Sequence, residues 1–191
     1  MRVRVGFVLL ALVAGCARTT PPSASPAVPV FSTAPVPTEE RTFPATCGDV
    51  ATLDDLTRLL NTLVTGDVHP IVGVAQENIG RTARLDCYYG VPAGKPVAAA
   101  KVWVGLASYV NEESARKRMT TTVNDERDAG AAVSDVLVGP DRGVLIRNAN
   151  WLLVATRGRI AVVVQVIPDL VRPDHAGALI GQLAAFALTS R

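Results

Sequence analysis

The chain has 191 residues, of which 49% are hydrophobic and 19% charged, with two histidines and a formal net charge of +2. This length fits one domain of ordinary size with an appended segment and excludes a multidomain machine. The hydrophobic content excludes a wholly disordered chain, and the small net charge gives little support to nucleic-acid binding.

The first sixteen residues have the layout of an export signal. Arg2 and Arg4 precede an unbroken apolar run over residues 5–13, and small residues then lead to Cys16. These features are typical of a secretory signal peptide, and the run is shorter than the ~20 residues that span a bilayer. We expect residues 1–15 to be removed. The mature chain then has 17 basic and 17 acidic side chains, so the positive charge belongs to the signal.

The sequence Leu-Val-Ala-Gly-Cys over residues 12–16 resembles the lipobox of bacterial lipoproteins. The resemblance implies that the signal peptidase cuts before Cys16 and that the sulfur of Cys16 carries a diacylglycerol. Several acyl chains, palmitate among them, would anchor the protein stably to the cell membrane on the side outside the cytoplasm, because a single chain binds only marginally. The alternative is a plain signal peptide with an incidental cysteine.

Residues 16–46 are interpreted as a tether that begins with the lipidated Cys16. Residues 17–46 contain seven of the chain's 13 prolines, no glycine and four charged residues. This composition cannot bury a core and favours extended conformations, so the segment is expected to lift the following domain off the membrane. A proline-rich docking motif and an O-glycosylated stalk remain alternatives.

Residues 47–191 are expected to form a single globular domain with two cysteines, Cys47 and Cys87. After export both meet an oxidising environment, so a disulfide between them is the simplest interpretation. By constraining the unfolded chain it would contribute about 4 kcal/mol. A thiol nucleophile or a metal pair is the weaker alternative, because there is no C-x-x-C motif and two cysteines are too few ligands for zinc.

The first part of the domain predicts a helix and three strands. Thr52 can cap a helix over residues 52–65, with Asp55 placed for a capping box. Strands are predicted over residues 71–75, 84–89 and 98–107. The apolar stripe of the helix comprises Leu53, Leu56, Leu59, Leu60, Leu63 and Val64. Alternation places Leu85, Cys87 and Tyr89 on one face of their strand, and Val102, Val104 and Leu106 opposite Lys101 and Trp103.

The second part predicts a surface helix, four strands and a closing helix. Asn111 can cap a helix over residues 111–128, whose buried stripe is thin. The apolar, β-branched run 160–164 suits a central strand that is covered on both faces. The four strands span residues 133–138, 144–148, 151–157 and 160–167, and the closing helix spans 173–189. The inward face of that helix comprises Leu179, Ile180, Leu183, Phe186 and Ala187.

The order of elements is α-βββ-α-ββββ-α, with short turns between the late strands and no βαβ rhythm. Turns this short force antiparallel hairpins. The predicted fold class is therefore α+β, with an antiparallel sheet of about six to seven strands packed against three helices.

Several features together resemble small exported lipoproteins of actinobacteria, of mycobacterial type. They are the lipobox, the tether, Cys47 just before a leucine-rich helix, and Cys87-Tyr88-Tyr89 in an early strand. The two-cysteine layout is also distantly similar to extracellular sensor domains of membrane Ser/Thr kinases from the same bacteria. The lipoprotein families are largely of unknown function, so the resemblance implies a cell-envelope location and supplies no catalytic residue.

The domain shows no catalytic or metal-binding constellation in its sequence. There is no G-x-S-x-G motif, and Ser114 with Lys117 forms an S-x-x-K match that lacks its partner motifs. The histidines, His69 and His175, are scattered, and the carboxylate clusters lack calcium-loop spacing. We therefore expect no enzymatic activity, no metal and no cofactor.

The candidates for ligand binding are Trp103, Tyr88 and Trp151, because semi-exposed aromatic side chains can anchor a partner. Packing in the core or at a sheet edge is the alternative for both tryptophans. Gly177 and Gly181 make a small-residue face on the closing helix, which favours close helix-on-sheet packing over dimerisation.

The expected function is a non-catalytic binding or accessory module at the cell envelope, held to the membrane by the lipid on Cys16. Its partner would be an apolar envelope lipid, a glycan or a protein, and not a nucleic acid. Two alternatives remain. One is a sensor partner of a membrane kinase or transporter, and the other is an envelope hydrolase whose reacting groups come together only on folding.

Overall fold

The computed structural model describes residues 43–189. The predicted signal peptide, Cys16 and almost all of the tether lie outside the described residues. Within the part of the chain that is described, no helix is long and apolar enough to cross a membrane.

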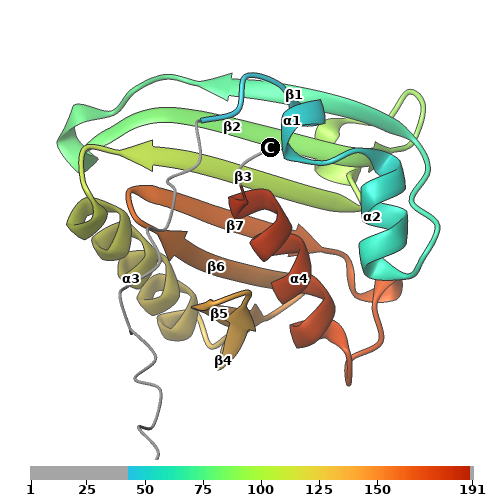
Figure 1. The fold of residues 1–191 in the computed structure, drawn as a ribbon. Coiled ribbons are helices and arrows are strands. Elements are labelled where there is room, and N and C mark those ends of the chain that lie inside the picture. Colours follow the sequence, from blue (N-terminus) through green and yellow to red (C-terminus); the bar gives the residue numbers. More distant parts are fainter. Residues whose placement is uncertain (1–42, 190–191) are drawn as a thin grey trace, which may run out of the picture. The chain divides into compact units, whose positions relative to one another are not determined.

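The described residues form a seven-stranded antiparallel sheet in the order β1-β2-β3-β7-β6-β5-β4 (Figure 1). The strands are β1 (Asp67–Gly73), β2 (Arg81–Val91), β3 (Val102–Tyr109), β4 (Ala132–Val138), β5 (Asp141–Arg147), β6 (Trp151–Arg157) and β7 (Ile160–Val166). The helices are α1 (Cys47–Val50), α2 (Leu53–Leu60), α3 (Glu112–Asp128) and α4 (Ala176–Leu188). Short 3-10 helices span Glu77–Ile79, Val97–Ala99 and Pro168–Leu170. The α+β class and the predicted order are confirmed, and the one-turn helix α1 is an addition to them.

Strand β7 lies in the middle of the sheet and joins its two halves. It pairs with β6 through a tight hairpin and with β3, which comes much earlier in the chain. Val162 and Val164 are fully buried on one face, and Ala161 is buried on the other. The prediction that this apolar, β-branched strand is covered on both faces is confirmed.

One face of the sheet carries the main core and is covered by α2 and α4, which lie side by side (Figure 1). The capping box of Thr52 and Asp55 starts α2 as predicted. The helix ends at Leu60, with Asn61 in the left-handed conformation, instead of continuing to residue 65. Leu63 therefore lies beyond the helix and is 70% exposed, so its predicted place in the buried stripe is wrong.

Several element boundaries differ from the prediction for local reasons. Strand β1 contains Pro70 within it, which is tolerated because β1 is an edge strand. The turn before β5 is formed by residues 139–140 alone, so β5 begins at Asp141. Helix α4 begins at Ala176 because the preceding residues form a turn, in which His175 N–H donates to the carbonyl of Arg172.

Helix α4 packs directly on the backbone of β4. A Cβ atom added to Gly181 would lie 2.3 Å from the carbonyl oxygen of Leu137, and one added to Gly177 would lie 3.2 Å from Val136 Cγ1. The two glycines therefore allow the close helix-on-sheet contact that their spacing predicted.

The opposite face of the sheet is covered by α3, which contacts β3, β7, β6, β5 and β4. This helix supplies Val123 and the half-buried Met119 to a second, smaller core with Leu152 and Val154. Its buried stripe is thin, as predicted, and the packing beneath it is less complete than in the main core. The candidate site lies beneath this helix.

Candidate binding site

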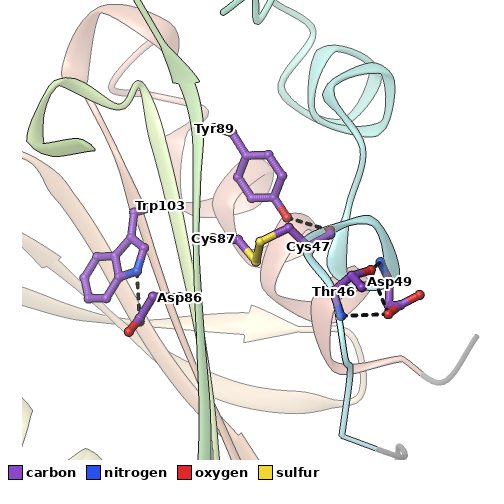
Figure 2. The surroundings of a disulfide bond; sticks show 7 residues. All are labelled: Thr46, Cys47, Asp49, Asp86, Cys87, Tyr89 and Trp103. Atoms are coloured by element: carbon purple, nitrogen blue, oxygen red, sulfur yellow. Dashed lines mark hydrogen bonds between the residues drawn. A yellow bond between two sulfur atoms is a disulfide. The ribbon is translucent and has the colours of Figure 1, made fainter. Parts of the chain in front are cut away.

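The disulfide between Cys47 and Cys87 ties α1 to β2 on the main-core face. The two Cα atoms are 5.5 Å apart across a sequence separation of 40, and both side chains are buried. The hydroxyl of Tyr89 donates a 3.0 Å hydrogen bond to the carbonyl of Cys47 (Figure 2). The predicted disulfide is confirmed, and it removes both sulfurs from the alternatives of a thiol nucleophile or a metal pair.

The other face of β2 carries a buried carboxylate. Figure 2 shows Asp86 and Trp103 on the opposite side of the strand from Cys87 and Tyr89. Asp86 is 5% exposed and accepts hydrogen bonds from Arg84 Nε at 2.6 Å and Arg84 Nη2 at 3.1 Å. Its Oδ1 also accepts one from Trp103 Nε1 at 3.1 Å. The carboxylate is thus held by a guanidinium and an indole through three hydrogen bonds.

A glycine in the neighbouring strand provides the room for this network. Gly105 lies opposite Asp86 in the β2–β3 register. A Cβ atom there would lie 2.7 Å from Asp86 Oδ1 and 3.1 Å from Trp103 Cζ2. The absence of a side chain at residue 105 therefore allows the carboxylate and the indole to meet over the strand.

Trp103 and Tyr88 form an aromatic pair on this face. They are directly opposite each other in the register of β2 and β3, with ring centroids 6.1 Å apart and an interplanar angle of 11°. Burial raises the pKa of Tyr88, and the charge of Asp86 raises it further while Arg84 opposes the change. Because Trp103 bonds to Asp86, the aromatic pair is fixed to the charged network.

A cavity of about 260 Å³ opens between α3 and the sheet, beside this network. One part of its wall is apolar and the other part is charged. The apolar wall includes Trp103, Ala107, Met119, Leu152, Val154 and Val163. The charged and polar wall includes Arg81, Arg84, Asp86, Tyr109, Arg118 and Glu126.

The charged wall has a surplus of cations. Arg84 is paired with Asp86, and that hydrogen bond raises the pKa of Arg84 although burial lowers it. Burial raises the pKa of Tyr109, whereas the positive charges of Arg118, Arg81 and Arg84 lower it. The positive charges of three guanidinium groups therefore act on the phenol of Tyr109, which lines the cavity.

The structure brings two of the three predicted aromatic residues together. Trp103 lines the cavity and Tyr88 stacks on it. Trp151 belongs to β6 and packs against the main core on the opposite face. Its Nε1 is buried and has no hydrogen-bond partner among the described residues. Trp151 is therefore separate from this cavity.

Sequence reasoning missed the charged residues of the site. Arg84 and Asp86 alternate with the buried Leu85 and Cys87 along β2, and this pattern is the signal that could have found them. Arg81 and Arg118 carry no such signal. They come to the same cavity only because α3 folds back across the strands.

The described residues contain no group of three or more His, Cys, Asp or Glu that could hold a metal ion. His69 and His175 are exposed, and His175 lies 3.3 Å from the carboxylate of Asp174. Neither histidine lines the cavity, whose wall also contains no serine and no cysteine. What the cavity wall offers is hydrogen-bond donors, positive charge and an apolar surface, which are the elements of a binding site.

Comparisons with known proteins find a similarity in structure, but no match to a family model or a curated protein. No family model matches it, and no curated protein matches it significantly. Among solved structures it is similar to the extracellular domain of PknH from Mycobacterium tuberculosis, with a TM-score of 0.46 and 10% sequence identity. That similarity covers 74% of this chain and 93% of the other.

Proposed function

We propose that this chain is an exported lipoprotein of the cell envelope whose domain is a non-catalytic binding module. In this proposal Cys16 carries the lipid, residues 16–46 form the tether, and the domain binds a ligand in the cavity beneath α3. The observation that carries the proposal is this cavity, where an apolar wall meets several convergent polar groups.

The charged groups beside the cavity support binding better than they support stability. A buried ion pair such as Arg84 with Asp86 often stabilises a fold no more than apolar residues of the same volume would. Gly105 is also a poor strand residue, and its absent side chain leaves space for this pair. Strand residues that are costly for folding and line a cavity are typical of a functional site.

We propose no catalytic role for the same cavity. Asp86 already accepts three hydrogen bonds from Arg84 and Trp103, and the described cavity wall contains no serine or cysteine for it to activate. A general base must lie within hydrogen-bond reach of the group that it activates. The hydrolase alternative therefore gains no support, and we propose neither a metal nor a cofactor.

Ligand retention by the full chain, purified in detergent, tests the binding function. Thr122 lines the cavity and Thr121 is its exposed neighbour on α3, and both hydroxyls bond to the backbone carbonyl four residues earlier. Thr122→Trp should fill the cavity, and Thr121→Trp is the matched control. Mass spectrometry of the denatured protein should find a small molecule released by the unmodified chain and by the control.

The same molecule should be absent from the Thr122→Trp protein. A released molecule that is equally abundant in all three proteins binds elsewhere and contradicts the site. A chain that releases nothing, and that binds none of the probes described below, contradicts the binding function itself.

Lipidation is tested by growing cells with an alkyne-labelled palmitate. The full chain should take up the label and sediment with membranes, whereas Cys16→Ala should do neither. Thr20→Ala, in the predicted tether, is the control that should keep both properties. Label on the Cys16→Ala protein would contradict the anchor.

A further inference from the structure

One guanidinium in the cavity wall is buried without a partner for its charge. Arg81 is 9% exposed and lines the cavity. Its Nη2 donates a 3.2 Å hydrogen bond to the carbonyl of Val74, while its Nε is buried and has no hydrogen-bond partner. Among residues 43–189 no carboxylate forms an ion pair with it. An arginine stays charged in proteins, so this buried charge lacks the compensation that buried charges normally have.

The neighbouring charges do not supply this compensation. Asp86 is already paired with Arg84 and also accepts a hydrogen bond from Trp103. Glu126, the other carboxylate in the wall, forms no ion pair with Arg81, and it accepts a 2.9 Å hydrogen bond from Asn148 Nδ2. Arg118, on α3, adds a further positive charge to the same wall, and no carboxylate among the described residues pairs with it. The described wall therefore holds three guanidinium groups, of Arg81, Arg84 and Arg118, against the two carboxylates of Asp86 and Glu126.

The backbone at Arg81 is irregular in a way that fits a binding role. The register of β2 against β3 shifts between Arg81 and Ala83, so that Arg81 pairs with Tyr109 out of step with the residues that follow. Irregularities of this kind, which include β-bulges, change the direction of the side chain concerned, and bulges are frequent beside functional sites. This irregularity and the unpartnered Nε are separate observations about one residue.

We propose that the cavity binds a small amphipathic carboxylate, with its anionic head at Arg81 and an aromatic or short aliphatic body against Trp103, Met119 and Val163. This inference rests on the proposed function and names the chemical class of its ligand. A cavity of about 260 Å³ is slightly smaller than the ~300–1,000 Å³ of pockets for drug-sized molecules, so the ligand is small. A water molecule could bond to Nε, but it would leave the buried charge uncompensated.

Phenylacetate and its uncharged amide, phenylacetamide, are probes that differ mainly in charge. Both are titrated into the full chain in detergent, and binding is followed through the NMR signals of the two tryptophan indoles. Phenylacetate should bind at least tenfold more tightly than phenylacetamide. It should shift the indole signal of Trp103 and leave the indole signal of Trp151 unchanged. Thr122→Trp should abolish its binding.

Two arginine variants and a control test which positive charge binds the carboxylate of phenylacetate. Arg81→Gln should remove the preference for phenylacetate over phenylacetamide. Arg118→Gln, on the exposed surface of α3, should weaken the binding of phenylacetate about threefold and leave the affinity for phenylacetamide unchanged. This variant tests the inference even where Arg81→Gln does not fold. Arg142→Gln is the control, because Arg142 is exposed on β5 and does not line the cavity.

The outcomes separate this inference from the function on which it rests. If both probes bind equally and Thr122→Trp blocks both, the cavity is a ligand site but the anionic class is overturned. If the ligand retained from cells has no acidic group, the anionic class is likewise overturned. Phenylacetate that binds without moving the Trp103 signal, or that keeps its preference in both arginine variants, also overturns the inference.

Discussion

The indole Nε1 of Trp103 donates a 3.1 Å hydrogen bond to Oδ1 of Asp86, across the boundary between β3 and β2. Because Asp86 is also held by Arg84, one buried network fixes the aromatic surface and the charge beside it. In the proposed binding function, a wall that is held in place in this way lowers the entropy that binding must offset.

Replacing the carboxylate of Asp86 should destabilise the protein. Asp86→Asn keeps the shape of the side chain but leaves the half-buried Arg84 without its counter-charge. Hydrogen bonds to charged groups contribute about 1.5–3 kcal/mol, so urea denaturation should show a loss in this range. Asp135→Asn is the control on the exposed edge strand β4 and should change stability by less than about 0.5 kcal/mol. Equal effects of the two substitutions would contradict the role of the network.

Adding one methyl group at residue 105 should displace the network. In Gly105→Ala the new Cβ atom would lie 2.7 Å from Asp86 Oδ1, so Trp103 or Asp86 must move. Overpacking of this kind costs about 1–3 kcal/mol, and the fluorescence of Trp103 should shift to the red as the indole loses its partner. Gly48→Ala is the control, since its nearest neighbour would be 3.6 Å away. Unchanged fluorescence in Gly105→Ala would count against the tight fit.

Sequence patterns predicted the parts of the fold that depend on local alternation. The two-residue period around Cys87 placed Leu85 and Tyr89 with it on the core face, and the β-branched run of β7 indicated a central strand. These features hold because one side chain in two must be buried, whatever the strand pairs with. The cysteine pairing was predictable because the predicted export signal implies an oxidising compartment, where two cysteines have little alternative to a disulfide.

The site itself depended on long-range pairing and could not be predicted in the same way. Trp103 and Trp151 both stand near the start of a strand, yet they face opposite sides of the sheet because β3 and β6 enter it in different registers. Arg81 has the sequence context of an exposed charge at a strand end. It lies at the register shift between β2 and β3, and it shares the cavity wall with Arg118 of α3, which comes later in the chain than both strands.

The two glycines of α4 should respond differently to alanine. Gly181→Ala would bring a Cβ atom to 2.3 Å from the rigid backbone oxygen of Leu137, so the helix must move away from β4. We expect a loss of about 1–3 kcal/mol in the free energy of unfolding. Gly177→Ala meets a side-chain methyl group of Val136 at 3.2 Å, and the helix propensity gained, about 1 kcal/mol, offsets that contact. Similar urea midpoints for both variants would contradict the direct helix-on-backbone packing.

Removing the disulfide should lower stability without changing the cavity. The double substitution Cys47→Ala and Cys87→Ala releases a cross-link with a sequence separation of 40, which the chain-entropy model puts at about 4 kcal/mol. A reductant should lower the unfolding midpoint of the unmodified protein and leave that of the double variant unchanged. Since the cross-link lies on the opposite face of β2 from Asp86, phenylacetate binding below the unfolding transition should persist. Loss of binding in a folded double variant would show that the two faces are coupled.

Stability should fall in alkali because of Tyr109. Burial raises the pKa of this phenol above its usual 10.0, although Arg118, Arg81 and Arg84 oppose the change. The folded protein therefore keeps a proton that the unfolded chain has already released. This contribution is complete below about pH 10 and is lost as the pH rises through the folded-state pKa.

Urea denaturation between about pH 8 and pH 11 should accordingly show a decline that is shallower in Tyr109→Phe, which has no proton to release. Because the pKa of Tyr88 is raised as well, ultraviolet titration should show one fewer late-ionising phenol in the Tyr109→Phe protein than in the unmodified chain. An equal slope of stability against pH in the two proteins would contradict the assignment. Because the arginine charges lower this pKa, Arg118→Gln should raise the pKa of Tyr109 further and steepen the decline.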